Sequence, residues 1–375
     1  MKNVYLIADN IYSPLGATTA QNFEQLLNDV SGVQMHNDKA MSDEPFFASL
    51  FEKTYFQTDI FWTKFEHLLI ASLTEALYET NIKISDKKTV LIISTTKGNI
   101  SLLETEQPGT ELDRRMTLHK SAINIAQHFG FVNQPIVVSH ACISGLAAMI
   151  TGMRLIQSGQ YDHAVVTGAD VISKFVLSGF QSFQAISPKL CKPFDVNRNG
   201  INLGEGAATV ILSAQKRSED SIRIAGGAVS NDANHISGPS RTGEELYFAI
   251  DKAMKSAGLQ AGNIDIISAH GTATIYNDDM EAKAITLASL QAIPVNSLKG
   301  FYGHTLGASG LIEAIISTQS LKQNLIIPTK GFKEQGEANP INVCSQLISK
   351  QLNNCLKIAS GFGGCNAAIV LTKSQ

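Results

Sequence analysis

The chain has 375 residues, of which 44% are hydrophobic and 17% are charged, and its formal net charge is −3. This length and composition suit one large globular domain or two fused halves. The weakly acidic balance gives no basic field, so it disfavours nucleic acid as a partner. No stretch approaches the roughly 18 apolar residues of a membrane span, and the apolar run at 4–8 is too short for a signal sequence. We therefore expect a cytoplasmic protein with no membrane span.

The five cysteines are an odd number, and none lies in a CxxC or Cys/His pattern typical of zinc sites. This pattern predicts reduced thiols, no disulfide and no metal, as is usual in a cytoplasmic compartment. Any cysteine chemistry is then that of a free thiol.

Strands and helices alternate in the predicted secondary structure of the first half. Short apolar runs indicate strands, and apolar residues at helical spacing indicate helices. In chain order, the pattern predicts a strand at 4–8, a helix at 61–78, a strand at 89–94, a helix at 118–129, a strand at 135–138, a helix at 143–157 and strands at 163–167 and 207–212. A polar stretch at 213–221 follows, so we divide the chain there into an N-terminal half, 1–220, and a C-terminal half, 221–375.

The second half repeats this alternation. The pattern predicts a strand at 222–229, helix at 243–256, strand at 264–269, helix at 278–290, strand at 293–295, helix at 308–323 and a final hairpin of 356–359 with 368–371. Residues 135–156 and 293–321 both run from a strand through a loop into a helix rich in small residues, which indicates an internal repeat. The predicted fold class is therefore α/β, with two related halves.

Three separated segments place reactive side chains directly after predicted strands. They are Ser139–Gly145 with Cys142, Ala269–Thr274 with His270, and Ser297–His304 with Lys299 and His304. Strand ends converge in α/β folds, so the three loops can share one cleft. One cysteine, two histidines and one lysine in glycine-rich surroundings indicate thioester chemistry.

Cys142 is the candidate nucleophile. It lies between a predicted strand and a predicted helix, so the positive end of the helix points at its sulfur. A free thiol titrates at about 8.5, and a helix N-terminus lowers this value, so the position favours the thiolate. Taken alone, such a residue also fits the role of a buried structural cysteine.

His270 and His304 are the candidate hydrogen-bond donors. Two neutral imidazoles that donate to one thioester oxygen would stabilise the enolate formed when a malonyl group loses carbon dioxide. Either histidine alone also fits a structural role. Lys299 and Glu281 could form an ion pair in the same cleft and fix the charges there and the tautomers of the histidines. Alternatively, the two could form a solvated ion pair with no catalytic role. The glycines around Phe362 suit a backbone oxyanion donor with a movable ring, or only a hairpin turn.

Together with Lys192–Asp195, Gly204–Gly206 and Gly361–Asn366, these segments resemble those of the β-ketoacyl synthases, the elongating condensing enzymes of fatty acid and polyketide synthesis. The resemblance spans nearly the whole chain. It implies a thiolase-like fold of two pseudo-symmetric α/β halves in five layers (αβαβα). It also implies an acyl carrier protein as partner, with substrates carried on its phosphopantetheine and no permanently bound cofactor, and either a homodimer or a heterodimer with a related chain-length subunit.

The resemblance also implies roles for the catalytic side chains. Cys142 would take an acyl group from the carrier, and His270 with His304 would polarise the incoming malonyl thioester for decarboxylation and Claisen attack. Lys299 and Glu281 match the supporting positions of the family.

Further positions match the substrate channel of the family. Thr272 and Thr274 match residues that hold the pantetheine arm, and Phe362 matches the gating phenylalanine. The backbone N–H groups of Cys142 and Phe362 would form the oxyanion hole.

Two departures from the family pattern concern partners. The segment 94–121 is short and lacks the usual Pro- and Phe-containing stretch at the dimer interface, so the acyl length stays open. The basic cluster near residue 65 is thin, and Gln184 stands where an arginine often meets the carrier. We hypothesise that the chain serves a dedicated carrier or partner subunit, and equal transfer rates from a housekeeping carrier would contradict this.

Other interpretations remain at this stage. The chain could be the active subunit of a heterodimer, or a non-catalytic scaffold, although a scaffold would lack the nucleophile that Cys142 provides. A coenzyme A thiolase would use a second cysteine, for which Cys365 is placed, but the Lys-x-x-x-Gly-His motif at Lys299 speaks against it.

Overall fold

The computed structural model describes residues 2–52, 61–233 and 238–374. Its main sheet has ten strands in the order β11-β10-β14-β15-β9-β1-β8-β6-β4-β5. The strands from the first half of the chain are β1 (Tyr5–Tyr12), β4 (Thr89–Ser94), β5 (Ile136–Val138), β6 (His163–Asp170) and β8 (Gly206–Ser213). Those from the second half are β9 (Ile222–Asn231), β10 (Ile266–Ser268), β11 (Val295–Asn296), β14 (Asn354–Gly361) and β15 (Cys365–Lys373).

The two halves of this sheet repeat one topology. When the five strands of each half are numbered by their order in the chain, they lie side by side in the sheet in the order third, second, fourth, fifth, first, from the outer edge to the centre. In both halves the second strand is parallel to the third and fourth, and the fifth is antiparallel to the fourth and first. The halves join through a short antiparallel pairing of β1 with β9, at Tyr5 and Leu6. The repeat supports the division of the chain near residue 220, which stays a prediction.

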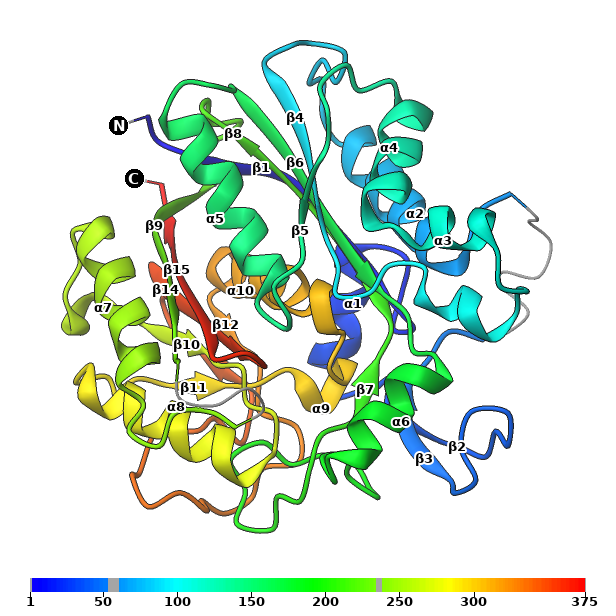
Figure 1. Ribbon diagram of the computed structural model, residues 1–375. Helices are drawn as coiled ribbons and strands as arrows, with labels where there is room; N and C mark the ends of the chain where they lie inside the picture. The colour runs from blue at the N-terminus through cyan, green and yellow to red at the C-terminus, as the bar shows by residue number, and fades with distance from the viewer. Residues whose placement is uncertain (1, 53–60, 234–237, 375) are drawn as a thin grey trace.

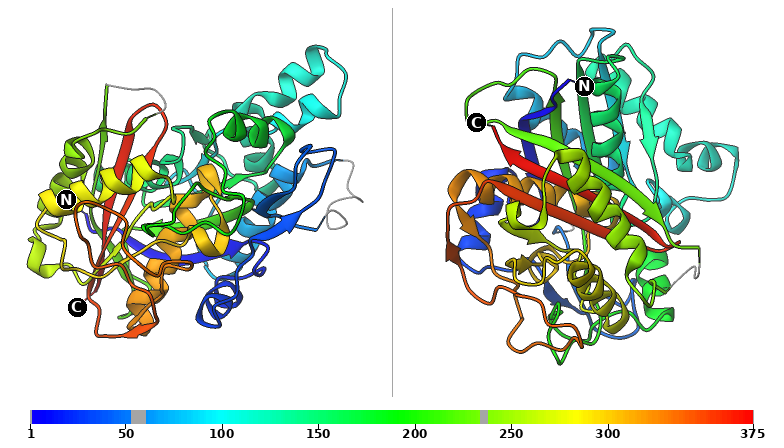
Figure 2. Two further views of the ribbon diagram at one scale, coloured as in Figure 1. Left: turned by 90° about the horizontal axis from the view of Figure 1, so that it is seen from below. Right: turned by 90° about the vertical axis from the view of Figure 1, so that its left-hand side faces the viewer.

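Helices form three layers around the two halves of the sheet (Figure 1). In the middle, α5 (Ser144–Gln157) and α10 (Ser309–Gln323) contact strands of both halves. On one flank α2 (Lys64–Tyr78) packs on β8, β1 and β6, beside α4 (Leu118–Phe129). On the other flank α7 (Glu244–Ala257) packs on β9 and β15, beside α8 (Ile275–Leu287), as Figure 2 also shows. The five layers α, β, α, β, α and the α/β fold class agree with the prediction.

The central helices meet at glycine. A Cβ atom on Gly145 of α5 would lie 2.8 Å from the backbone nitrogen of Leu311, and one on Gly310 of α10 would lie 2.8 Å from the backbone nitrogen of Leu146. Both helices are buried along most of their length, so neither shows a polar face. The small residues of the two predicted helices thus permit the close approach expected of them.

Shorter elements connect the layers. They are α1 (Thr19–Leu27), α3 (Thr110–Met116), α6 (Lys174–Ser182), α9 (Lys299–Tyr302), β2 (Gln34–His36), β3 (Phe46–Ser49), β7 (Leu203–Gly204), β12 (Leu325–Ile326) and β13 (Ile348–Ser349), with 3₁₀ turns η2 (Ile100–Glu104), η3 (Ala261–Asn263) and η4 (Leu306–Ala308). Helix α2 begins later than predicted because Thr63 caps it in a capping box with Glu66. In the described part of the chain, no helix has the length and apolar character needed to cross a membrane.

Candidate active site

Cys142 lies in the tight turn between β5 and α5, as predicted. The preceding residue, Ala141, has φ +45°, a left-handed conformation that is uncommon for a residue with a Cβ atom. The Ser144 hydroxyl fastens the turn, because it accepts from the His140 N–H at 2.8 Å and donates to the Ala141 carbonyl at 2.6 Å. The turn therefore fixes the position of a cysteine that is only 8% exposed.

The expected low pKa of the Cys142 thiol is wrong for this site. Burial raises the pKa of Cys142, while the Lys299 ammonium and the backbone N–H of Phe362 act in the opposite direction. Desolvation of the charged sulfur outweighs these two favourable contacts. Cys142 is therefore a neutral thiol until a substrate or a base removes its proton.

His270 and His304 face Cys142 from the second half of the chain. His270 follows β10 and His304 follows α9, and their rings meet edge to face with centroids 5.0 Å apart. The cysteine sulfur and one ring nitrogen of each histidine all lie within 4.8 Å of one another. The structure thus brings together the three residues that the sequence placed in separate loops.

Both imidazoles are held in the neutral form. His270 and His304 are 2% and 1% exposed. Burial, followed by the charge of Lys299, holds the pKa of each ring well below its ordinary value. Both ring nitrogens of His304 lack a hydrogen-bond partner among the described residues. Buried polar atoms without partners are costly, so these nitrogens are suited to a ligand oxygen.

The group of Cys142, His270 and His304 has donor types that zinc binds. Among the described residues, no fourth histidine, cysteine or carboxylate joins the group. A structural zinc site has four protein ligands. The absence of a metal from the site stays a prediction.

Lys299 supports the histidines, but its carboxylate partner is Glu313 and not Glu281. The ammonium nitrogen lies 3.4 Å from Nδ1 of His270 and forms an ion pair with Oε1 of Glu313. The second carboxylate oxygen of Glu313 lies 2.7 Å from the ammonium nitrogen of Lys357. The predicted pairing of Lys299 with Glu281 is therefore wrong, because the helix α10 brings a closer carboxylate.

Glu281 instead shapes the loop that carries His270. Its carboxylate accepts from the backbone N–H groups of His270 at 2.7 Å and Gly271 at 2.6 Å, and from Asn277 at 2.8 Å. The neighbouring Asp278 accepts from the backbone N–H of Thr272 at 2.9 Å. Burial, followed by the charge of Glu281, raises the pKa of Asp278 to about 8. The two acidic side chains thus hold the loop in place.

The loop of His304 depends on close backbone contacts at two glycines. The His304 N–H donates to the Asn202 carbonyl at 2.7 Å, and the Gly204 N–H donates to the His304 carbonyl at 3.0 Å. A Cβ atom on Gly204 would lie 2.0 Å from the Tyr302 carbonyl oxygen, and one on Gly303 would lie 2.4 Å from the Leu203 carbonyl oxygen. The Gly-Glu-Gly motif and the Gly-His motif therefore act as one structural unit.

Thr272 and Thr274 lie on the same loop as His270. Their hydroxyl oxygens are 2.8 Å apart, and Thr272 is buried while Thr274 is half-buried. Ala273 between them has φ +59°, so both hydroxyls turn to one side of the loop. This placement agrees with their expected position beside the substrate arm, whose binding stays a prediction.

Phe362 lies at the exposed edge of the site, where the sequence analysis placed the gate. It is 38% exposed, and its ring stacks on Phe180 with centroids 5.7 Å apart. Phe183 packs against the same ring at 5.5 Å. The sequence analysis did not identify either neighbour, because the pattern did not separate the short helix α6 (Lys174–Ser182) from a loop.

Cys365 also lies beside the nucleophile. Its thiol donates to the Phe362 carbonyl at 3.3 Å and approaches the His140 carbonyl at 3.6 Å. Burial, followed by the proximity of Cys142, raises the pKa of Cys365 to about 12. A thiol with so high a pKa is a poor candidate for the base that a thiolase needs.

Glu313 and Lys357 are site residues that the sequence analysis missed. Both side chains are almost fully buried. The signal was present in the sequence, because each is a single charge in an otherwise apolar element: Gly310-Leu-Ile-Glu-Ala-Ile-Ile316 and Cys355-Leu-Lys-Ile-Ala359. Charged residues in such positions are almost always paired.

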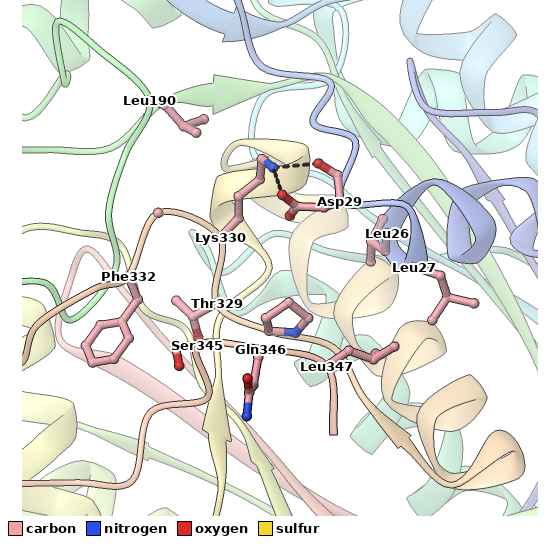
Figure 3. Close-up of a pocket in the computed structure, with 12 residues that line it drawn as sticks. Leu26, Leu27, Asp29, Leu190, Thr329, Lys330, Phe332, Ser345, Gln346 and Leu347 are labelled. Atoms are coloured by element: carbon pink, nitrogen blue, oxygen red, sulfur yellow. Dashed lines mark hydrogen bonds and ion pairs between the residues drawn. The ribbon is translucent and has the colours of Figure 1, made fainter. Parts of the chain in front are cut away.

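A pocket of about 390 Å³ lies near the site but does not belong to it (Figure 3). Its wall includes Thr329 and the ion pair of Lys330 with Asp29, whose nitrogen and oxygen are 2.8 Å apart. The Thr329 hydroxyl accepts from the backbone N–H of Ser297 at 3.1 Å, two residues before Lys299. The pocket therefore lies behind the Lys299 loop, and its lining includes none of the reactive side chains.

Comparison with known proteins identifies the family. Residues 2–218 match the N-terminal domain of β-ketoacyl synthases, and residues 222–333 match the C-terminal domain. The chain belongs to the β-ketoacyl synthase family. The division of the chain near residue 220 stays a prediction.

Individual relatives agree with this assignment. The chain is 32% identical to the 3-oxoacyl-[acyl-carrier-protein] synthase 2 of Rhizobium meliloti over 69% of its own length and 65% of that protein. It is 33% identical to a putative polyketide β-ketoacyl synthase 1 of Streptomyces halstedii over 67% of its own length and 63% of that protein. The aligned region thus spans somewhat less than two thirds of these relatives. A synthase 2 of Vibrio cholerae is 26% identical over 99% of both chains.

Solved structures show the same fold. The ketosynthase (ApeO) in complex with its chain length factor (ApeC) from Xenorhabdus doucetiae superposes with a TM-score of 0.87, at 25% identity, over 99% of this chain and 98% of that chain. A β-ketoacyl synthase from Burkholderia phymatum superposes with a TM-score of 0.88, at 22% identity, over the whole of both chains. The fold is thus that of the ketosynthases.

Proposed function

We propose that the protein catalyses decarboxylative Claisen condensation of a Cys142-bound acyl group with a malonyl thioester on an acyl carrier protein, which gives a 3-oxoacyl thioester. The observation that carries the proposal is the meeting of the Cys142 sulfur with the ring nitrogens of His270 and His304 within 4.8 Å. A nucleophilic sulfur beside two neutral donors is what this reaction requires.

In the first half of the reaction, the Cys142 sulfur attacks the acyl thioester of the carrier. The acyl carbon–sulfur bond to the pantetheine breaks, and the proton of Cys142 passes to the departing pantetheine sulfur. His304 is the neutral base within reach of that proton. The backbone N–H of Phe362, which points at the Cys142 sulfur, supports the oxyanion hole with the N–H of Cys142.

In the second half, His270 and His304 donate to the thioester oxygen of the malonyl group. The bond between the malonyl carboxylate and its α-carbon breaks, which releases carbon dioxide and leaves an enolate stabilised by the two donors. The enolate carbon attacks the acyl carbonyl on Cys142, and the carbon–sulfur bond to Cys142 breaks. The product leaves on the carrier, and the Cys142 thiolate takes up one proton from solvent, which regenerates the thiol.

Intact-mass spectrometry tests the proposal. The protein is incubated with a panel of acyl-carrier thioesters and then with malonyl-carrier, and the masses of protein and carrier are followed. We expect an acyl adduct on Cys142 that is discharged into a chain two carbons longer. Reversible acetyl transfer between coenzyme A esters without carbon dioxide release would support a thiolase instead, and no adduct with any primer would favour the scaffold.

A heterodimer is the second candidate for the oligomeric state of the active enzyme. The strand β5 lies at the edge of the main sheet, where β4 is its one strand neighbour within the described residues, and its three residues are half-buried. An edge strand with unpaired backbone groups is suited to pair with a second chain. We propose a dimer through this edge, with either a second copy or a related chain-length subunit. Size-exclusion chromatography with light scattering, with the protein alone and co-expressed with such a subunit, separates the two cases.

A further inference from the structure

Lys357 is a buried cation at the site that the reaction described above does not use. Its side chain is fully buried. It lies on β14, where it is paired in register with Ser268 of β10, the strand that leads into His270. The same strand β14 continues to Gly361, directly before the gating Phe362. Lys357 thus lies between the loop that carries His270 and the turn that carries Phe362.

The ammonium group of Lys357 has four oxygen neighbours. The nearest is Oε2 of Glu313, at 2.7 Å. The others are the backbone carbonyl oxygens of Ile358 at 2.8 Å, Ala269 at 3.0 Å and Ser268 at 3.2 Å. An ammonium has three protons, so these neighbours can satisfy it fully. Burial lowers the pKa of Lys357, and the charge of Glu313 acts in the opposite direction.

The charges around this group do not balance. Glu313 is the ion-pair partner of both Lys299 and Lys357, so one carboxylate serves two ammonium groups. Glu281 is the next carboxylate, but it binds the backbone N–H groups of His270 and Gly271, and burial raises its pKa. The cluster of these two ammonium groups and their one shared carboxylate therefore carries one excess positive charge. Such a charge is costly in a buried position and becomes favourable when an anion enters.

We propose that Lys357 is a positioning residue that makes the site selective for the anionic extender. The excess positive charge attracts the malonyl carboxylate and stabilises the enolate that follows. It acts through the pair of Lys299 and Glu313 and does not touch the substrate. The acyl group that loads Cys142 is neutral, so its transfer gains nothing from this charge. The inference rests on the proposed condensing function.

The charge of Lys357 also affects the two histidines, and this effect likewise favours stabilisation of the enolate. Lys357 is among the cations that lower the pKa of both His270 and His304. The groups that face it are Lys299 and Glu313 from α9 and α10, Glu281 from α8 and the two imidazoles. After burial and the charge of Lys299, Lys357 therefore adds a smaller contribution to keeping the two rings neutral, which is the form that donates to the thioester oxygen without trapping a proton.

The test uses Lys357→Met, which keeps the length of the side chain and removes its charge. Malonyl-carrier decarboxylation is measured in Cys142→Gln protein with and without Lys357→Met, and loading of Cys142 by an acyl-carrier is measured in the single Lys357→Met variant. We expect KM for malonyl-carrier to rise by about tenfold or more, with loading within about twofold of the parent protein. Equal losses in both half-reactions, or no change in KM, would overturn the proposal.

A double variant separates charge from packing. Lys357→Met with Glu313→Gln removes one positive and one negative charge. The remaining ammonium of Lys299 then has no carboxylate partner in this cluster, so the cluster again carries one excess positive charge. Recovery of KM toward the parent value supports the charge proposal. No recovery assigns the loss to the contacts with the Ser268 and Ala269 carbonyls, and overturns it. If Lys357→Met does not fold, Lys357→Gln, which keeps a donor toward these carbonyls, takes its place.

The result also distinguishes this inference from the proposed function. If Cys142→Gln protein releases no carbon dioxide from malonyl-carrier, the condensing function itself fails. If it decarboxylates malonyl-carrier and Lys357→Met has no effect on KM, only the role of Lys357 fails.

Discussion

The rings of His270 and His304 meet edge to face, with centroids 5.0 Å apart and an angle of 84° between their planes. This arrangement turns two donors toward one point from different directions. A single thioester oxygen at that point can accept from both rings, and the Cys142 sulfur lies on the same side. The geometry therefore couples stabilisation of the enolate to its delivery onto the acyl group.

The first prediction concerns the separate roles of Cys142 and the two histidines. His304→Ala should lower the rate of malonyl-carrier decarboxylation by about 10²- to 10³-fold, the usual loss for one oxyanion donor. Cys142→Gln should abolish condensation but leave decarboxylation, because both histidines remain. Carbon dioxide release and product mass are measured in parallel. Condensation by Cys142→Gln protein would refute the assigned nucleophile.

The second prediction concerns stability below neutral pH. The folded-state pKa values of His270 and His304 lie well below their ordinary value because of burial. The two unfolded-state imidazoles therefore bind protons below about pH 6.5 that the folded-state rings do not, so the contribution of these rings to stability is full above this pH and falls as the pH drops. Each ring should cost about 1.4 kcal/mol per pH unit in that window.

Urea unfolding at several pH values between 7 and 5 checks this expectation. The matched variant is His304→Asn, which removes one of the two titrating rings and should flatten the slope by about one proton. An unchanged slope in this variant would show that His304 is protonated in the folded state.

The third prediction concerns the reactivity of the cysteine in the absence of substrate. Burial raises the pKa of Cys142, so labelling by iodoacetamide should increase with pH through and beyond the ordinary thiol range near 8.5. Lys299→Met should move the midpoint to still higher pH, because it removes the cation that opposes burial. Peptide mass mapping follows the label on Cys142. A labelling midpoint well below pH 8 would instead support the interpretation that the N-terminus of α5 stabilises the Cys142 thiolate.

The fourth prediction concerns the backbone contact that carries His304. Gly204→Ala should destabilise the protein by more than about 2 kcal/mol and reduce decarboxylation, because its Cβ atom would collide with the Tyr302 carbonyl oxygen at 2.0 Å. The matched control is Gly179→Ala in α6, where nothing lies within 4 Å of the new Cβ atom.

Helix propensity should make the Gly179→Ala protein as stable as the parent or more so, by roughly 0.5–1 kcal/mol. Thermal unfolding and carbon dioxide release are compared for both variants. Equal behaviour of the two alanines would mean that the Gly204 contact has no role in holding the His304 loop.

The sequence predicted the regular fold well because its hydrophobic pattern is strong. The predicted elements at 89–94 and 118–129 coincide with β4 and α4, and the small residues of α5 and α10 pack as expected. Helix α8 begins at Ile275, three residues earlier than predicted. The sequence pattern missed this first turn because its apolar residues Ile275 and Tyr276 are exposed and do not follow the helical spacing of the buried residues. Helices α1, α3 and α6 are short, and the pattern did not separate them from loops.

The site was harder to predict than the fold. Cys142, His270, Lys299 and His304 carry local signals, because each follows a strand in a glycine-containing loop. The partner of Lys299 carries no such signal, because Glu313 lies on a different element and only packing brings it near. Glu281 was chosen because it lies on a predicted helix beside the cleft and matches a supporting position of the family, whereas its carboxylate is occupied by backbone N–H groups. The ionisation of Cys142 likewise depends on burial, which a sequence motif does not contain.

The position of β15 also affects how the chain is made. This strand lies between β14 and β9, and through it β14, β10 and β11 are joined to the rest of the main sheet. During translation, Cys142 and both histidines leave the ribosome before β15 does. Strand β9 already pairs with β1, but β14, β10 and β11 have no hydrogen-bonded connection to it within the main sheet until β15 is inserted. The strand β10, which leads into His270, should therefore join the main sheet only in a late step of folding.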